Sequence, residues 1–225
     1  MKKTVILISG KKRTGKNALA DYITEAAKEM GLTVWQGLFA GPLKDACRQD
    51  FAPLAAFLKA EHARLVGHGI PPEEIPWMDV QDEQFYEAKT PLTRILLQVY
   101  GTQIFRDRVD KDYWTKKMVE SLDRQEAEVL LITDTRFPNE VLLPTEWAEA
   151  RDYRSCCVRV HREVSRDAQG EHESETALDD FAVWDHVVRN DGPLADLKRH
   201  AREVLYGALS REPQHPGDYI VEMRG

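Results

Sequence analysis

The chain contains few cysteines, and their spacing fits neither a disulfide framework nor a zinc site. Its 225 residues include only Cys47 and the adjacent pair Cys156 and Cys157, with no C-x-x-C spacing and an odd total. Disulfide-rich domains and structural zinc sites both need paired or clustered cysteines. The composition therefore excludes those two classes and is typical of a protein kept in a reducing compartment.

Hydrophobic runs long enough to cross a membrane are also missing, and so is an excess of positive charge. Met1-Lys2-Lys3 leads directly into a short apolar run with no signal segment, so we expect a cytoplasmic protein with no membrane partner. The 38 acidic residues outnumber 31 basic ones, and the net charge of −7 argues against broad binding to nucleic acid. The length fits one domain over residues 1–210, followed by a tail over 211–225.

The most informative stretch, residues 5–23, combines a short apolar run, a glycine-bounded loop and an amphipathic segment. The spacing Gly10-x4-Gly15-Lys16 is that of a Walker A motif, in which glycines let successive backbone N–H groups point at one anion. A helix that begins at Lys16 adds its positive dipole end to the same point. A lysine-rich surface turn is the alternative, but the flanking strand and helix favour a nucleotide-phosphate site. Asn17 follows the lysine, so the hydroxyl that usually contacts magnesium is missing.

Apolar runs and helical periodicity alternate along the rest of the chain, which predicts an α/β fold. We expect a parallel sheet covered by helices on both faces, in three layers. The strands are expected at 5–8, 33–39, 129–133, 156–160 and 186–189. Helices are expected over 16–30, from residue 42, and over 54–66, 90–101, 112–124 and 194–209, with a long surface excursion at 67–91.

Asp134 lies at the carboxyl end of the apolar run 129–133, and in an open α/β sheet that edge is where ligands bind. It is therefore a Walker B-like candidate for holding magnesium, directly or through water. Arg136 is two residues further on and projects to the same side if the chain is extended there. The alternative is that these residues form an ordinary charged turn.

Further positive side chains are candidates for holding phosphate groups. Arg94 and Gln98 are four residues apart on one helix face, where an arginine can take a phosphate bidentately while a carboxamide contacts a base edge. Adenylate kinase-like enzymes place an arginine and a glutamine at this spacing to hold the monophosphate and read its base. Arg106 and Arg108 are additional phosphate candidates, with ordinary surface ion pairs as the alternative.

The charged segment 161–177 is predicted to cover the site, with Arg162 and Arg166 closing on the transferred phosphate. Arginines that act as arginine fingers do would contribute ~10³–10⁵-fold in rate, whereas the alternative is a flexible charged loop. His172 has no second histidine or cysteine at zinc spacing, so we interpret it as a hydrogen-bonded anchor of this lid. An apolar stripe at helical spacing is expected to be core: Trp114, Met118 and Leu122.

Several motifs follow one another along the chain: Gly10-x-Lys12-Arg13-Thr14-Gly15-Lys16-Asn17, Phe39-Ala40-x-Pro42-Leu43-Lys44, Arg94-x-Leu96-Leu97-Gln98-x-x-Gly101, Trp114, Asp134-x-Arg136-Phe137-Pro138-Asn139-Glu140, Ser174-Glu175 and Asn190-Asp191-Gly192. In this order they resemble the deoxynucleoside monophosphate kinases of tailed phages. The resemblance spans residues 4 to about 205, and its most specific part is the motif from Asp134 to Glu140.

The resemblance implies transfer of the γ-phosphate of ATP to a deoxynucleoside monophosphate, with ATP and Mg²⁺ as cofactors. It implies a P-loop kinase fold with a mobile lid over about 161–177 and a helical substrate-binding region over about 40–125. The implied ATP-binding residues are Gly10, Lys12, Arg13, Thr14, Gly15, Lys16, Asn17, Asn190 and Asp191. The implied catalytic residues are Lys16, Asp134, Arg136, Arg162 and Arg166, with Asp134 organising the metal. The implied acceptor-binding residues are Phe39, Lys44, Arg94, Gln98, Arg106, Trp114, Arg136 and Glu140.

Two positions after the loop lysine bear on this resemblance. Asn17 agrees with the family, which often carries Asp or Asn there, whereas Ala18 stands where a threonine is frequent. How the metal is held therefore stays open, and coordination through water would suffice. Two other functions also remain: a dephospho-coenzyme A kinase-like or other small-molecule kinase, and a P-loop module that binds nucleotide without turnover. The sequence does not determine which bases the enzyme accepts, whether it forms a homodimer, or what residues 67–90 and the tail do. If the chain is encoded by a phage, we expect it in the cytoplasm of the host.

Overall fold

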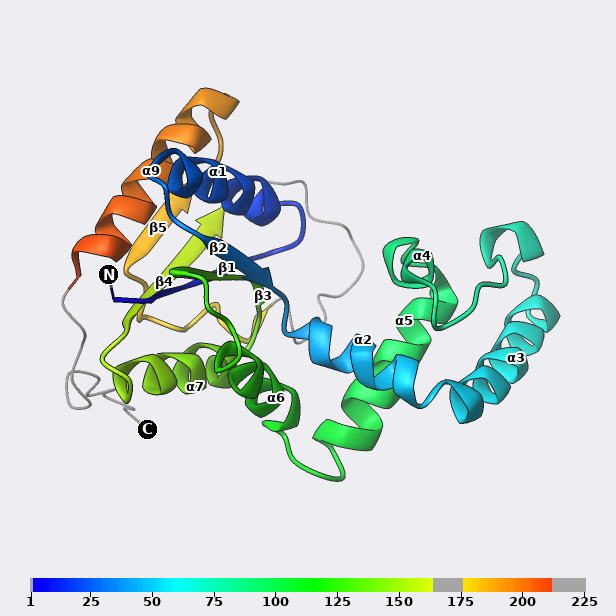
Figure 1. The fold of residues 1–225 in the computed structure, drawn as a ribbon. Coiled ribbons are helices and arrows are strands. Elements are labelled where there is room, and N and C mark those ends of the chain that lie inside the picture. Colours follow the sequence, from blue (N-terminus) through cyan, green and yellow to red (C-terminus); the bar gives the residue numbers. More distant parts are fainter. Residues whose placement is uncertain (1, 164–175, 212–225) are drawn as a thin grey trace. The chain divides into compact units, whose positions relative to one another are not determined.

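The computed structural model describes residues 2–163 and 176–211 and is shown in Figure 1. Contacts between Cα atoms divide the chain into two compact units. The first comprises Met1–Phe39 and Met118–Gly225, and the second comprises Ala40–Lys117. The expected strands all belong to the first unit, and the second consists of helices and their connections.

A five-stranded parallel sheet forms the centre of the first unit, in the order β2-β3-β1-β4-β5. The central strand β1 pairs with β3 on one side and β4 on the other, so that Thr4 lies opposite both Val129 and Arg154. Every residue of β1 is buried, as expected for the centre of a sheet covered on both faces. The strands are β1 (Thr4–Gly10), β2 (Val34–Gly37), β3 (Val129–Thr135), β4 (Arg154–His161) and β5 (His186–Arg189).

Helices cover the two faces of this sheet. Alternate residues of a strand point to opposite faces, so Ile6 packs on one side and Leu7 on the other. The adjacent Cys156 and Cys157 of β4 separate in the same way. Helices α1 (Lys16–Glu29) and α9 (Leu194–Ser210) pack on the first face, and α7 (Pro138–Glu149) and the end of α6 (Tyr113–Leu122) pack on the second (Figure 1). The predicted three-layer α/β architecture is confirmed.

The connections between strands place a ligand-binding edge beside β1 and β3. From β1 the chain crosses one face through α1 to reach β2, and from β3 it crosses the other face through α7 to reach β4. The chain therefore changes face between two neighbouring strands. In open α/β sheets, ligands bind at the carboxyl ends of strands at such a switch point.

The second unit has an apolar core of its own, which includes Leu58, Phe85, Leu92 and Leu96. Helix α5 begins after Thr90, whose Oγ1 accepts a hydrogen bond from the Thr93 amide at 3.2 Å. It continues directly into the π-helix η2. The elements of this unit before α6 are α2 (Ala40–Gln49), α3 (Phe51–Gly67), η1 (Pro72–Glu74), α4 (Glu83–Glu87), α5 (Pro91–Gln98) and η2 (Val99–Arg106).

Three segments differ from the sequence-based expectation. Residues 67–91 are not simply a surface excursion, because Ile75 and Phe85 are buried in the core of the second unit. The strand expected at 33–39 is shorter, and helix α7 was not predicted at all. Among the described residues, no helix combines the length and apolar character needed to cross a bilayer.

Candidate active site

The phosphate loop connects β1 to α1, and two of its positions require glycine. A Cβ on Gly10 would lie 2.6 Å from the carbonyl oxygen of Val160. Gly15 has φ 97°, and a Cβ there would lie 2.3 Å from the side-chain amide nitrogen of Asn190. Any larger residue would clash at both points, and at Gly15 the backbone conformation is also costly for other residues. These positions are the two glycines of the predicted Walker A spacing.

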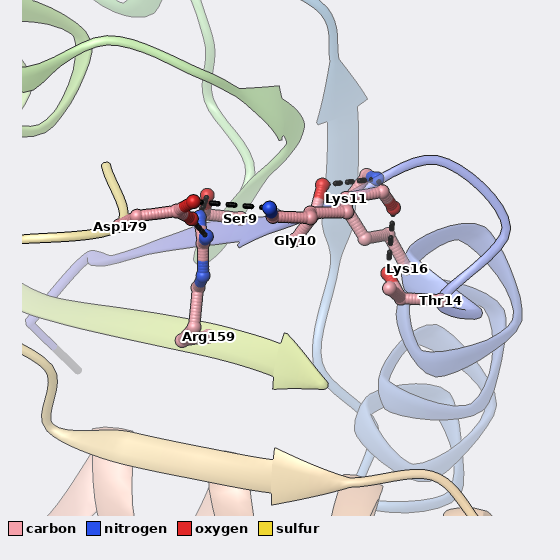
Figure 2. Close-up of polar contacts among 7 residues, drawn as sticks. All are labelled: Ser9, Gly10, Lys11, Thr14, Lys16, Arg159 and Asp179. Atoms are coloured by element: carbon pink, nitrogen blue, oxygen red, sulfur yellow. Dashed lines mark hydrogen bonds and ion pairs between the residues drawn. The ribbon is translucent and has the colours of Figure 1, made fainter. Parts of the chain in front are cut away.

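Lys16 folds back onto the loop that precedes it (Figure 2). Its Nζ donates hydrogen bonds to the carbonyl oxygens of Gly10 at 2.5 Å and Lys11 at 2.7 Å. The Lys11 carbonyl also accepts from Thr14 Oγ1 at 2.9 Å. Lys16 thus places a positive charge at the loop, while Lys12, Arg13 and Asn17 are exposed.

Asn190 joins the end of β5 to this loop. Its Nδ2 donates to the Thr14 carbonyl at 2.9 Å, and its own backbone amide donates to the His161 carbonyl at 2.8 Å. Its neighbour Asp191 accepts a hydrogen bond from the Glu163 amide at 2.8 Å. Of the two residues expected near ATP at this position, Asn190 therefore contacts the phosphate loop directly.

Asp134 is the second-last residue of β3, at the switch point of the sheet. Its Oδ1 accepts a hydrogen bond from the Phe39 amide at 2.7 Å, and the Phe39 side chain is buried in the core beneath. No group of three or more His, Cys, Asp or Glu side chains in the described ranges is placed to hold a metal ion. Asp134 could hold a magnesium ion through its one carboxylate, with phosphate oxygens and water as further ligands.

Glu140 holds the start of α7 together. Its Oε2 accepts from the backbone amides of Arg136 at 2.7 Å and Phe137 at 3.1 Å, and the residue is only 9% exposed. A glutamate three residues into a helix commonly satisfies the amide at the N-cap in this way. The predicted role of Glu140 in binding the acceptor stays a prediction, and Arg136 is partly buried next to it.

A pocket of about 350 Å³ lies beside the phosphate loop, at the carboxyl ends of β2 and β3. Asn17 is its one lining residue that the motif analysis assigned to the site. The other lining residues carry amide, carboxylate, hydroxyl and apolar groups. The sequence marked them only by their place at the end of a strand or one turn into α1. They are Asp21, Gln36, Gly37, Leu38 and Thr133.

The predicted acceptor residues of the second unit have different environments. Arg94 and Gln98 are both exposed on α5, as their spacing on one face requires. Lys44 lies with its Nζ 5.6 Å from the centre of the Tyr86 ring, and Arg106 is half-buried in η2. Trp114 is 7% exposed, and its Nε1 donates to the Gly101 carbonyl at 2.9 Å. The expected burial of the stripe is confirmed: Trp114, Met118 and Leu122 are all core residues.

The predicted lid is only partly within the described chain. Arg162 is exposed just after β4, whereas Arg166 and residues 164–175 lie outside the described residues. His161, the last residue of β4, is described. Although the residue is exposed, partial desolvation of its imidazole and the nearby positive charges of Arg159 and Arg189 lower its pKa.

Sequence reasoning missed a set of polar residues beside the phosphate loop. Lys11 Nζ lies 3.0 Å from Asp179 Oδ2, and Arg159 donates to Asp179 Oδ1 at 2.8 Å. Arg159 also donates to the Ser9 hydroxyl at 2.9 Å (Figure 2). Asp179 belongs to no motif, and its partners are far from it in the sequence, so no local signal could have found this arrangement.

A sequence model of the deoxynucleotide monophosphate kinase family matches residues 78–201, more than half of the chain. The chain belongs to this family. It is a phosphotransferase that phosphorylates deoxynucleoside monophosphates, and family membership implies ATP as the donor. The matched part of this kinase includes Arg94, Gln98, Asp134 and Asn190, while its phosphate loop precedes the match.

Two solved structures are similar to this kinase at low sequence identity. A gluconokinase from Sinorhizobium meliloti 1021 is 16% identical, with a TM-score of 0.40, over 90% of this chain and 91% of that chain. A de novo designed protein with a P-loop NTPase fold is 14% identical, with a TM-score of 0.37, over 96% of this chain and 98% of that chain. No curated protein sequence matches the chain.

Proposed function

We propose that this kinase moves the γ-phosphoryl group of ATP directly to the phosphate of a deoxynucleoside monophosphate, in line and without a covalent enzyme intermediate. The observation that supports this most is the phosphate loop, with Lys16 folded onto its carbonyls and Asp134 at the end of the adjacent strand. Phosphoryl transfer needs positioning and neutralisation of charge more than it needs covalent chemistry from the protein. The described residues at the loop supply groups for both.

The loop residues suit the phosphates of ATP. Gly10 and Gly15 lack the Cβ that would obstruct close approach, and the N-terminus of α1 presents a positive dipole end. Lys16 is already at the loop, so only its side chain has to turn for its ammonium to meet a phosphate oxygen. Thr14, Gly15 and Asn17 complete the expected binding segment, and Asn190 supports it from the other side.

Asp134 is the residue we assign to the metal. Its Oδ1 is oriented by the Phe39 amide, and Mg²⁺ is commonly held by one or two carboxylates together with phosphates and water. Bound there, Mg²⁺ would supply charge neutralisation on the phosphate oxygens. Asn17 lacks the hydroxyl of other Walker A motifs, so we propose that water takes that place in the coordination of the ion.

We assign the acceptor to the residues that the sequence resemblance implies. On α5, Arg94 would take the monophosphate and Gln98 would contact the base edge, since both are exposed on one face. Lys44 and Arg106 would add positive charge, and Arg136 would neutralise the transferred group. Phe39 and Trp114 are buried, so they would support the neighbouring acceptor residues from the core. We further propose that the enzyme works in a cytoplasm, because three free cysteines accord with a reducing compartment.

The test is release of ADP from ATP and Mg²⁺ with each of the four standard deoxynucleoside monophosphates offered separately. Turnover that depends on both the acceptor and Mg²⁺ is the expected result, and the pattern of rates would give the base preference. ATP binding measured by calorimetry would accompany it. Binding of ATP with no turnover on any of the four would contradict the proposed mechanism for standard acceptors and favour a modified base or a binding module.

A further inference from the structure

One carboxylate beside the phosphate loop joins two positive residues that come from different parts of the first unit (Figure 2). Oδ1 of Asp179 accepts a hydrogen bond from Nη2 of Arg159 at 2.8 Å. Its Oδ2 lies 3.0 Å from Nζ of Lys11, the first residue after β1. Asp179 therefore connects the segment that follows β4 in sequence to the beginning of the phosphate loop.

Arg159 gives this carboxylate a fixed partner. The arginine is 5% exposed, and its other guanidinium nitrogen donates to the Ser9 hydroxyl at 2.9 Å. Ser9 and Arg159 are also direct neighbours across the β1–β4 pairing. The guanidinium carbon lies 5.6 Å from the centre of the Trp184 ring, which restricts it further. A buried guanidinium needs a paired charge, so Asp179 is held in place by the sheet itself.

Lys11 is the residue through which this anchoring reaches the loop. Its carbonyl oxygen accepts hydrogen bonds from Thr14 Oγ1 at 2.9 Å and from Lys16 Nζ at 2.7 Å. The Thr14 amide lies 3.4 Å from the same oxygen. The turn of the loop and the resting position of its lysine therefore both depend on where the Lys11 backbone lies.

We propose that Asp179 is a positioning residue for the ATP site: held by Arg159, it fixes Lys11 and, through the Lys11 carbonyl, the conformation of the phosphate loop. This inference rests on the proposed role of the loop in binding ATP. The loop amides converge on an anion in only one conformation. Loss of the Asp179 charge therefore weakens binding of ATP and leaves binding of the acceptor unchanged.

The first experiment replaces Asp179 by asparagine, which keeps the size and one acceptor oxygen but removes the charge. We expect KM and Kd for ATP to rise about tenfold, the effect of about one charge-assisted hydrogen bond. KM for the deoxynucleoside monophosphate should stay within about twofold, and Asp179→Glu should restore part of the ATP affinity. Unchanged Kd and KM for ATP in Asp179→Asn would overturn the proposal.

Asp185→Asn is the matched control. Asp185 also follows β4, pairs with Arg211 Nη1 at 2.6 Å and accepts from the Cys157 amide at 2.7 Å, but it has no contact with the phosphate loop in the described structure. We expect this variant to lower the melting temperature without changing Kd for ATP. An equal loss of ATP affinity in both variants would mean that Asp179 acts only through general stability, against the proposal.

A double-mutant cycle that combines Asp179→Asn with Lys11→Met tests whether Asp179 affects ATP binding through Lys11. If Asp179 acts through Lys11, the double variant binds ATP no more weakly than the weaker of the two single variants. Additive losses of ATP affinity would show that Asp179 does not act through Lys11.

Equilibrium binding is measured apart from turnover, so a wild-type protein that binds ATP but phosphorylates no acceptor would contradict the proposed function alone. Failure of the wild type to bind ATP would contradict both.

Discussion

The side-chain amide of Asn190 donates a hydrogen bond to the carbonyl oxygen of Thr14 at 2.9 Å, across 176 positions of sequence. The same amide nitrogen would lie 2.3 Å from a Cβ placed on Gly15. The end of β5 thus packs against the phosphate loop so closely that the loop has no room for a side chain at this point. The glycine of the motif serves the protein's own packing as well as the approach of a phosphate.

Gly15→Ala should therefore destabilise the protein and abolish tight binding of ATP. Gly31→Ala is the control, because Gly31 has φ 76° but nothing lies within 4 Å of a Cβ there. Gly31→Ala should lower the free energy of unfolding by about 1–2 kcal/mol, the cost of the left-handed conformation for alanine. Gly15→Ala should lower it by more. Adding Asn190→Ala to Gly15→Ala should recover part of the difference in chemical denaturation. Equal losses for the two glycine variants would contradict the clash.

Lys16→Ala should lower turnover by about 10²–10³-fold, because it removes the ammonium that donates to two carbonyls of the phosphate loop. Lys28→Ala, a change near the end of the same helix, is the matched control and should have normal activity. Circular dichroism would show whether both variants are folded. Near-normal turnover of folded Lys16→Ala would remove this lysine from the mechanism.

Asp134→Asn should keep the fold and change the response to metal. The asparagine oxygen can still accept from the Phe39 amide, whereas the charge that would attract Mg²⁺ is gone. We expect kcat to fall and the Mg²⁺ concentration for half-maximal rate to rise. Titrating Mg²⁺ at saturating ATP measures both, and an unchanged titration curve would exclude Asp134 as the metal-organising residue.

Gln98→Ala should alter the relative rates on the four deoxynucleoside monophosphates more than it changes binding of phosphate. Arg94→Ala should instead raise KM for all four acceptors to a similar degree. Gln103→Ala, an exposed glutamine in η2, is the control for a lost carboxamide. The same ranking of bases in wild type and Gln98→Ala would rule out base contact by this side chain.

His186 should make stability fall on mild acidification. Burial and the nearby Arg211 lower the pKa of His186 below its ordinary 6.5, although Asp185 and Glu203 act in the opposite direction. The unfolded chain then binds more protons than the folded one, so the free energy of unfolding decreases as pH drops through 6.5 and levels off below the folded-state pKa. Urea denaturation between pH 5 and 8 measures this, and His186→Gln should reduce the slope. Identical slopes would contradict the assignment.

The sequence predicted those parts of the fold that local pattern alone determines. The run 129–133 and the loop from Gly10 to Lys16 have length, apolar character and glycine spacing that suit only a few structures. Helix α7 was missed because Pro144 interrupts its pattern, although Pro138 at its first position and Glu140 two residues later are typical of a helix start. Residues 67–91 were misread since a few well-spaced apolar residues suffice to bury a segment rich in proline and charge.

The candidate site likewise contains residues that local sequence predicts and residues that only the folded chain brings together. Lys16 and Asp134 follow from their positions after buried strands, and the connectivity of the sheet then places those strands side by side. Asp179 could not be predicted, because its partners Lys11 and Arg159 are brought to it by the path of the chain after β4. The pocket beside Asn17 also depends on the ends of two different strands.

The three buried cysteines can report the rate of local unfolding in three different parts of the structure. Cys47 belongs to the second unit, whereas Cys156 and Cys157 face opposite sides of the sheet. Burial raises the pKa of Cys47 and of Cys157 to about 12, and it raises the pKa of Cys156 as well. A thiol reagent at neutral pH therefore reacts with each cysteine only while its surroundings are open. Labelling resolved to the individual cysteine, since Cys156 and Cys157 share a peptide, would report how fast the helical unit and each face of the sheet open. It would also show whether nucleotide slows the opening of only one of them.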